Sequence, residues 1–267
     1  GGGRGEEGEK MLRQSALGGG FEGAATPELR GEGAAIGDFK RSDRIVVGTE
    51  VEWAREYMRE IYQPLFLNES PILFVSRRTS EVIKYAANAF LATKITFINE
   101  MADLCEKVGA NVQDVSRGIG LDGRIGAKFL HAGPGYGGSC FPKDTLALMK
   151  TAQDHEAPLQ IVEAVVRVND LRKRAMARKV IAAMGGDVEG KRIAMLGLTF
   201  KPNTDDMRDA PSLDIIPALQ VARAPRTPFH PEGAPEPPLH ARHAHRHSPL
   251  YPPPHRPRPR PPLHAPP

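Results

Sequence analysis

The chain of 267 residues has only two cysteines, Cys105 and Cys140. So few cysteines exclude a disulfide framework and fit a reducing compartment. Neither belongs to a CxxC pair, and most of the nine histidines lie near the C-terminus, so the ligand spacing of a metal site is missing. No apolar run reaches membrane-spanning length, and no signal-peptide pattern opens the chain. The sequence therefore predicts a cytoplasmic protein with no metal and no membrane partner.

Hydrophobic residues make up 40% of the chain but are scarce at both ends. Residues 1–26 are rich in Gly and Glu, and residues 221–267 hold about two thirds of the 25 prolines together with much Arg and His. Such compositions do not build a core, so both ends are predicted to be disordered. The basic tail inflates the net charge of +4 but lacks interleaved aromatics. We expect no nucleic-acid partner, and binding of the tail to nucleic acid or anionic surfaces stays a minor alternative.

The region between the two ends begins with a strand, helix and strand pattern. β-branched runs at 44–48 and 71–75 read as strands. Between them, residues 50–62 repeat apolar side chains at helical spacing. This order is typical of an α/β domain, whose end we assign to residues 27–78.

A long helical pattern follows, capped by Thr79 or Ser80 and unbroken to about Val108. A helix of this length predicts a spine between two domains or a dimer contact. Further helical patterns end at Gly120, run through Lys150 and extend from 159 to 184. Together they predict a central helical domain over residues 79–185.

A buried-strand pattern at 192–200, a polar loop and a helix to about Leu219 then indicate the start of a second α/β domain, residues 186–220. The loop after the strand is where α/β sheets bind nucleotides. The predicted fold is thus α/β with a long helical centre. The basic run over residues 172–179 of the preceding helix reads as a solvated face.

One glycine-rich run, residues 133–138, leads Cys140 to the start of a predicted helix that Pro142 opens. Unpaired backbone N–H groups, the helix dipole and the neighbouring Lys143 favour a thiolate there. Asp144 lies about one turn later and is a candidate base on the same side. The alternative is a buried cysteine that acts as a small hydrophobe, and the residues leave both interpretations open.

Lys84 and Asn88 stand four residues apart on the long helix and share a face. An ammonium and an amide within an otherwise apolar face stabilise a developing oxyanion, and a desolvated lysine also acts as a base. A solvated polar stripe is the commoner meaning of such a pair.

At these residues the chain resembles a known family. GPGYGGSCFPKD, residues 133–144, is similar to the catalytic-cysteine motif of the UDP-glucose dehydrogenases, within the wider nucleotide-sugar dehydrogenase group. Residues 81–100 follow that family's E-x-x-K-Y-x-x-N-x-F…N-E signature, and residues 200–208 its F-K-P-N-T-D-D-x-R motif. Residues 124–130 resemble R-I-G-x-K-F-L, and residues 27–39 resemble N-P-E-F-L-R-E-G-x-A-x-x-D-F with departures at its start.

This resemblance implies a set of functional residues. Cys140 would form covalent intermediates, Lys84 and Asn88 would stabilise oxyanions, Asp144 would position or activate water, and Glu28 would assist. The substrate-binding residues that it implies are Lys84, Asn88, Arg124, Phe129, Leu130, His131, Ala132, Gly133, Gly137 and Lys201, of which Arg124 reaches a neighbouring subunit's site. Those implied on the cofactor side are Glu32, Lys143 and Arg208.

The activity that the resemblance implies is the four-electron oxidation of UDP-glucose to UDP-glucuronate by NAD, through a thiohemiacetal and a thioester. It also implies a homodimer or higher homo-oligomer formed through the central helix. The cysteine motif favours UDP-glucose over the GDP-mannose of related enzymes, which stays an alternative. The family's GxGxxG domain is not recognisable in the sequence. A catalytically inactive chain that keeps the dimerisation core and weak UDP-sugar binding is therefore the other alternative.

Overall fold

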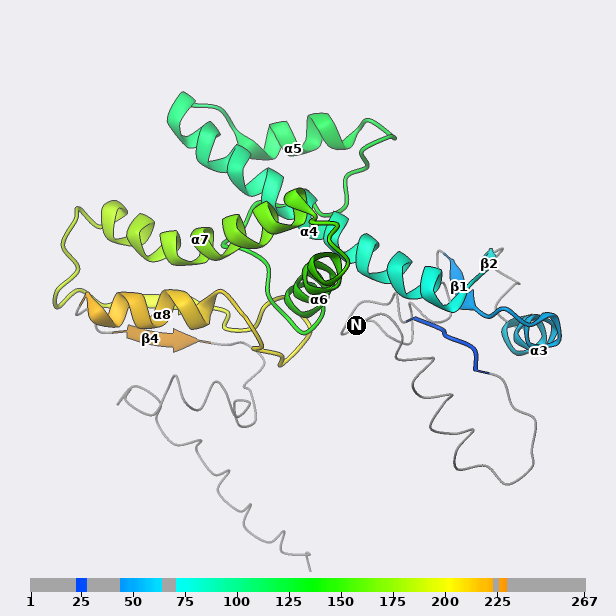
Figure 1. The fold of residues 1–267 in the computed structure, drawn as a ribbon. Coiled ribbons are helices and arrows are strands. Elements are labelled where there is room, and N and C mark those ends of the chain that lie inside the picture. Colours follow the sequence, from blue (N-terminus) through cyan, green and yellow to red (C-terminus); the bar gives the residue numbers. More distant parts are fainter. Residues whose placement is uncertain (1–22, 28–43, 64–70, 223–225, 230–267) are drawn as a thin grey trace, which may run out of the picture.

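The computed structural model describes residues 23–27, 44–63, 71–222 and 226–229. It consists of two small α/β units joined by a body of long helices (Figure 1). The elements in chain order are β1 (Ile45–Gly48), α3 (Glu52–Tyr62), β2 (Ile72–Val75), α4 (Arg77–Val108), α5 (Val112–Gly120), α6 (Phe141–Asp154), α7 (Gln160–Ala183), β3 (Ile193–Leu196), α8 (Ser212–Val221) and β4 (Arg226–Phe229). This confirms the predicted α/β fold with a long helical centre.

The first unit is a parallel pair of strands, with Ile45 of β1 opposite Ile72 of β2 and helix α3 between them in the chain. All four residues of β1 are buried. The unit abuts the start of α4, because a Cβ on Gly48 would lie 2.8 Å from the Arg77 Cα and closer still to the Ser80 hydroxyl. Only glycine fits at the end of this strand.

Helix α4 begins earlier than predicted. Its N-cap is Ser76, whose hydroxyl accepts the Thr79 N–H at 3.1 Å, so the assignment of the cap to Thr79 or Ser80 is wrong. The Glu50 carboxylate accepts the Arg77 N–H and its Nε–H, which satisfies the first turn from outside the helix. The helix ends as predicted at Val108, because Gly109 adopts a left-handed φ of 72°.

The helical body is formed by α4, α6 and α7, with α5 against α4. Its core is built around Ala92, Tyr136 and Val165, and Ile95 and Phe141 pack against them. Because Tyr136 belongs to the loop before α6, the core also fixes that loop. Helix α6 continues to Asp154, beyond the predicted end at Lys150, and buries Ala152 in the added turn.

The second unit packs on α7 through a cluster of Ala177, Ile215 and Leu219. Strand β3 is shorter than the predicted run of 192–200, because Gly197 has a φ of 84°. Strand β4 pairs with β3 in parallel, and Ile193 lies opposite Arg226. For these four residues the prediction of a disordered tail is wrong, since strand pairing with a distant segment is not visible in local composition. In the described part of the chain, no helix is long and apolar enough to cross a bilayer.

Candidate active site

Cys140 is the N-cap residue of α6, and Pro142 lies in the first turn, as the sequence predicts. The Cys140 side chain makes no capping hydrogen bond, and its sulfur lies 3.6 Å from the Ser139 hydroxyl. The thiol is half-buried. The Cys140 sulfur therefore lies at the positive end of the dipole of α6, a helix of 14 residues, and no capping hydrogen bond engages it.

Asp144 is brought together with Asn88. The Asp144 side chain is 1% exposed, and its Oδ2 accepts a hydrogen bond of 2.7 Å from the Asn88 Nδ2. The Lys143 ammonium lies 3.9 Å from the other carboxylate oxygen and is itself exposed. Asp144 also donates its backbone N–H to the Cys140 carbonyl at 2.8 Å, which places the carboxylate one turn from the thiol. An amide from α4 and the lysine thus offset the burial of this charge.

Lys84 precedes Asn88 by one turn of α4 and is half-buried. In the described ranges no hydrogen bond or ion pair occupies its ammonium. Asn88 has two amide hydrogens and gives one to Asp144. This face of α4 therefore holds donors that remain available to a ligand.

The cysteine loop, which we define as residues 133–139, is tied to two helices. The Asn169 side chain of α7 accepts the Tyr136 N–H at 2.8 Å and donates to the Tyr136 carbonyl at 3.1 Å. The Gly133 N–H is accepted by the Asn99 side chain of α4 at 2.7 Å. Gly135 has a φ of 123°, and a Cβ there would lie 3.0 Å from the Asn169 Oδ1. The loop is held by three specific hydrogen bonds at two of its residues, Gly133 and Tyr136.

The Tyr136 phenol lies in the apolar core beneath this loop. Burial raises its pKa to about 12; a hydrogen bond with Thr145 acts in the opposite direction, and the charge of Asp170 adds to the rise. Tyr136 is accordingly a neutral packing residue at physiological pH. Its ring contacts the Phe141 ring edge-on at a centroid distance of 5.9 Å.

Two glycines bring the cysteine loop against the second α/β unit. Gly138 donates its N–H to the Arg208 carbonyl at 2.7 Å. A Cβ on Gly137 would overlap the Asp209 carbonyl and stand 3.0 Å from the Ala210 Cα. A Cβ on Gly138, whose φ is 85°, would meet the Phe200 ring at 2.7 Å. The segment predicted to bind UDP therefore touches the loop that carries Cys140.

The basic residues of that segment, Lys201 and Arg208, reach its surface. Arg208 forms a two-pronged pair with the buried Asp206, at 2.9 Å from Nε and 2.8 Å between Nη2 and the second oxygen. Lys201 is half-buried, and its ammonium lies 5.5 Å from the centre of the Phe200 ring.

The predicted site residues before the cysteine loop, from Arg124 to Ala132, are spread over exposed and buried positions. Arg124 is 89% exposed and pairs with Asp122 at 2.6 Å, which raises the pKa of the guanidinium. Phe129, with a φ of 67°, places its ring 6.1 Å from that of Phe141, next to Cys140. Leu130 is buried, and its carbonyl accepts the Ser116 hydroxyl at 2.6 Å. His131 is exposed and Ala132 half-buried. The predicted Glu28 and Glu32 lie outside the described residues.

Sequence reasoning missed Asn169 and Arg172, both on α7. The prediction of a solvated face is wrong at Arg172 and at Lys173, whose side chains are largely buried against α4 and the cysteine loop. The available signal was the position of Asn169 three residues before Arg172, which places both on one helix face. A carboxamide directly after Val165, Val166 and Val168 also marks a buried polar contact.

The described residues of the first α/β unit do not fit a dinucleotide. A cradle for a pyrophosphate needs a glycine-rich turn after the strand. After β1 the chain continues as Thr49-Glu50-Val51, and Gly48 faces α4 instead of a ligand. Among the residues described, no group of acidic, Cys and His side chains has the arrangement of a metal site.

Fold and site together define an α/β protein in which a helical centre presents a thiol at a helix start beside an amide–carboxylate pair. The profile of the UDP-glucose/GDP-mannose dehydrogenase family, central domain, matches residues 78–171. The profile of the same family's UDP binding domain matches residues 194–251. The chain belongs to the UDP-glucose/GDP-mannose dehydrogenase family.

Relatives and solved structures that resemble the chain carry names from the same family. The UDP-glucose 6-dehydrogenase of Rhizobium meliloti is 66% identical over 233 residues, which are 86% of this chain and 53% of that protein. The enzyme of the same name from Rickettsia felis is 50% identical over 74% of this chain and 44% of its own length. Among solved structures, a UDP-glucose dehydrogenase from Pyrobaculum islandicum superposes with a TM-score of 0.78 at 36% identity, over 84% of this chain and 51% of that one. The chain thus spans about half the length of these relatives.

Proposed function

We propose that this chain carries the cysteine-centred chemistry of a UDP-glucose 6-dehydrogenase, the oxidation of UDP-glucose to UDP-glucuronate with NAD as oxidant. The single observation that supports this most strongly is the hydrogen bond of 2.7 Å from Asn88 to the buried Asp144, one turn from Cys140. The three residues come from two separate helices and fall inside the central-domain match. Packing alone gives no reason to bury a carboxylate beside a half-buried thiol.

The first step that these residues perform is addition. The Cys140 sulfur attacks the C6 aldehyde of the once-oxidised sugar, and the carbonyl electrons move to oxygen. Lys84 and the second amide hydrogen of Asn88 donate to that oxygen, which is protonated to give a thiohemiacetal. NAD would supply the hydride acceptor for both oxidations, of which the second would convert the thiohemiacetal held on Cys140 to a thioester.

The last step is hydrolysis. Water attacks the thioester carbon and gives one proton to Asp144, and Cys140 leaves as thiolate. The carboxylic acid that forms and Asp144 each release a proton to solvent, which restores the starting state. Asp144 is suited to this role because Asn88 fixes one of its oxygens and leaves the other 3.9 Å from a lysine. The uronate then dissociates.

For the substrate we propose UDP-glucose, held between the cysteine loop and the second α/β unit. The match of the UDP binding domain over 194–251 supports a uridine nucleotide. We assign Lys201, Gly133, Gly137 and residues 129–132 to sugar-nucleotide contacts, and Lys143 and Arg208 to the cofactor side. We also assign Arg124 to a neighbouring subunit's site, which agrees with its exposure.

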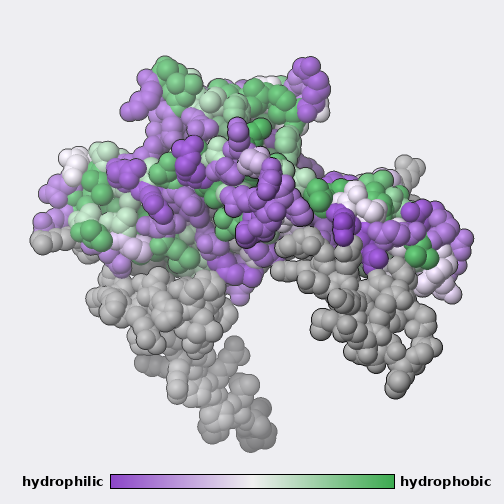
Figure 2. Space-filling model, in the orientation of Figure 1, coloured by the Kyte–Doolittle hydropathy of each residue, from purple (hydrophilic) through white to green (hydrophobic). Residues whose placement is uncertain are grey.

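We propose self-association through the exposed end of the helical body. Hydrophobic residues interrupt the polar surface over α5 and the end of α4 (Figure 2). Leu104, Val108 and Leu121 in this region are between 51% and 82% exposed. Apolar groups gathered in this way mark protein contacts.

A free thiol at Cys140 agrees with the reducing cytoplasm as the place of this reaction.

A second candidate is a chain that binds the UDP-sugar without turning it over. The observation that favours it is that the described residues of the first α/β unit include no glycine-rich turn after a strand. Both candidates predict occupation of the cysteine centre by the sugar nucleotide, and only the first predicts oxidation.

The experiment measures two signals on the purified chain. Formation of NADH at 340 nm from UDP-glucose and NAD reports turnover, and Cys140→Ala is expected to abolish it. Mass spectrometry then follows alkylation of Cys140 by iodoacetamide. UDP-glucose at about ten times its dissociation constant is expected to slow this alkylation about tenfold. The buried Cys105 serves as the internal control for unfolding.

Each outcome separates the candidates. Protection by UDP-glucose with NADH formation supports the dehydrogenase, and protection without NADH supports the non-catalytic chain. Protection by GDP-mannose in place of UDP-glucose assigns the other substrate of the family. If neither nucleotide sugar protects Cys140, the proposed substrate site is wrong.

A further inference from the structure

The cysteine loop is fastened by residues other than Asn88 and Asp144. Helix α7 presents Asn169 and Arg172, three residues apart and therefore on one face. Asn169 holds both backbone polar groups of Tyr136, and Arg172 donates its Nε–H to the Gly133 carbonyl. The two side chains grip the loop at points three residues apart.

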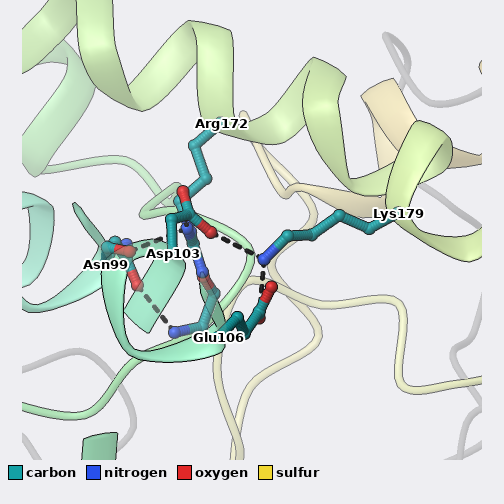
Figure 3. A network of polar contacts seen from close by, with 6 residues as sticks. Asn99, Asp103, Glu106, Arg172 and Lys179 are labelled. Atoms are coloured by element: carbon teal, nitrogen blue, oxygen red, sulfur yellow. Dashed lines mark hydrogen bonds and ion pairs between the residues drawn. The ribbon is translucent and has the colours of Figure 1, made fainter. Parts of the chain in front are cut away.

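Arg172 makes more contacts than a surface ion pair does. Besides the Gly133 carbonyl, its Nη1 donates to the Asn99 carbonyl and to the Asp103 carboxylate, each at 2.9 Å. Its side chain is 9% exposed. Figure 3 shows Arg172 reaching from α7 toward α4 between Asn99 and Asp103. A planar guanidinium serves three acceptors in fixed directions, and a lysine ammonium does not reproduce that fork.

The same network has a second part that does not touch the loop. Lys179 pairs with Asp103 at 2.6 Å and with Glu106 at 2.7 Å, and these contacts join α7 to α4 alone. Partial burial raises the pKa of Asp103, but hydrogen bonds and charge from Lys179 and Arg172 outweigh it and lower the pKa below 3.8. The network therefore offers a matched pair of cations. Arg172 contacts the cysteine loop, and Lys179 contacts α4 alone.

We propose that Arg172 is a positioning residue for Cys140. By fixing the Gly133 carbonyl while Asn99 fixes the Gly133 N–H, it sets the entry of the cysteine loop and hence the place of Cys140 relative to Asn88 and Asp144. Arg172 acts through the loop and does not itself touch the reacting groups. The catalytic meaning of this role rests on the proposed function, whereas the ordering of the loop does not.

The test compares Arg172→Ala with Lys179→Met by amide hydrogen exchange and mass spectrometry, on the chain without substrate or NAD. Loss of the Arg172 contact is expected to speed exchange in a peptide spanning residues 131–139 by about tenfold, equivalent to about 1.4 kcal/mol of opening free energy. Exchange in α4 and α7 beyond the network should stay within about twofold. Lys179→Met is expected to leave the loop peptide unchanged, and Arg172→Lys to recover part of the protection.

Alkylation of Cys105 shows whether a variant has unfolded, because this thiol is buried on α4 between the two acids of the network. The proposal is overturned if the loop peptide of Arg172→Ala exchanges as in the parent chain. It is equally overturned if Arg172→Ala and Lys179→Met have the same effect, or if Cys105 becomes reactive together with the loop. Where the parent chain turns over UDP-glucose, Arg172→Ala should lower kcat by about tenfold and change KM by less than about threefold.

Discussion

Residues 84–88 and residues 99–103 of α4 both carry polar side chains, but the two stretches differ in how many contacts those side chains make inside the protein. Near the start, Lys84 has no partner in the described chain and Asn88 gives one of its two amide hydrogens to Asp144. Near the end, Asn99 accepts from Gly133, and Asp103 accepts from two cations of α7. We call the first stretch, together with its partner Asp144, the open side, and the second stretch, which joins α4 to the cysteine loop and to α7, the bridging side.

This difference separates chemistry from architecture. Polar side chains that join one element to another fix the geometry between those elements. Groups with spare donors next to a thiol are available to a reacting oxygen. Replacements on the bridging side should therefore reduce stability, and replacements on the open side should reduce activity at little cost in stability.

The largest loss of stability is expected for Gly137→Ala. The added methyl would overlap the Asp209 carbonyl, so the backbone must shift and the second α/β unit must part from the cysteine loop. We expect the free energy of unfolding to fall by about 3 kcal/mol, measured by urea denaturation. Gly118→Ala in α5 is the control, because a Cβ there has open space and helix propensity favours Ala. Equal stability of the two variants would contradict the close approach.

The second largest loss of stability is expected for Asn169→Ala. It leaves the buried N–H and carbonyl of Tyr136 without partners, at a cost of about 2 kcal/mol. The exposed Arg174→Ala on the same helix should change stability by less than about 0.5 kcal/mol. Thermal unfolding of both variants by circular dichroism measures the difference. If Asn169→Ala leaves the thermal unfolding unchanged, water or a rearranged loop takes over the two hydrogen bonds.

Asp144→Asn tests the open side. The substitution removes a buried charge and keeps an acceptor for Asn88, so the free energy of unfolding should change by less than about 1 kcal/mol. NADH formation, where the parent chain shows it, should fall by about a hundredfold, because the proposed water-activating base is gone. A large loss of stability with unchanged turnover would place Asp144 among the architectural residues and break the comparison.

The smallest effect is expected for Lys179→Met, about 0.5 kcal/mol, since both its acids are more than half exposed. Its pH dependence has a definite sign. The lowered pKa of Asp103 contributes stability above pH 3.8 that is lost as the pH falls through the folded-state pKa. The raised pKa of Lys179, where hydrogen bonds and charge from Asp103 and Glu106 exceed the opposing effect of burial, contributes stability below pH 10.5. The difference from the parent chain should be constant between these values and shrink outside them.

The sequence was sufficient for features that depend on local signals. Uninterrupted helical periodicity and Gly109 gave the end of α4, and the glycine run with Pro142 placed Cys140 at a helix start. It was insufficient where a distant partner decides. Ser76, Thr79 and Ser80 are all good caps, and the Glu50 carboxylate on the first turn accompanies the choice of Ser76. In the same way, nothing local shows that Arg172 faces a loop carbonyl or that β4 has a strand to pair with.

The length of α4 has a mechanical consequence. At a rise of 1.5 Å per residue, its 32 residues make a rod about 48 Å long. One end is wedged against the β1–β2 sheet through Gly48 and Ser80, and the other carries α5. A tilt of about 5° about one end therefore displaces the other by about 4 Å. Lys84 and Asn88 lie close to the sheet end, so such a tilt would move the thiol's partners least and the surface proposed for self-association most.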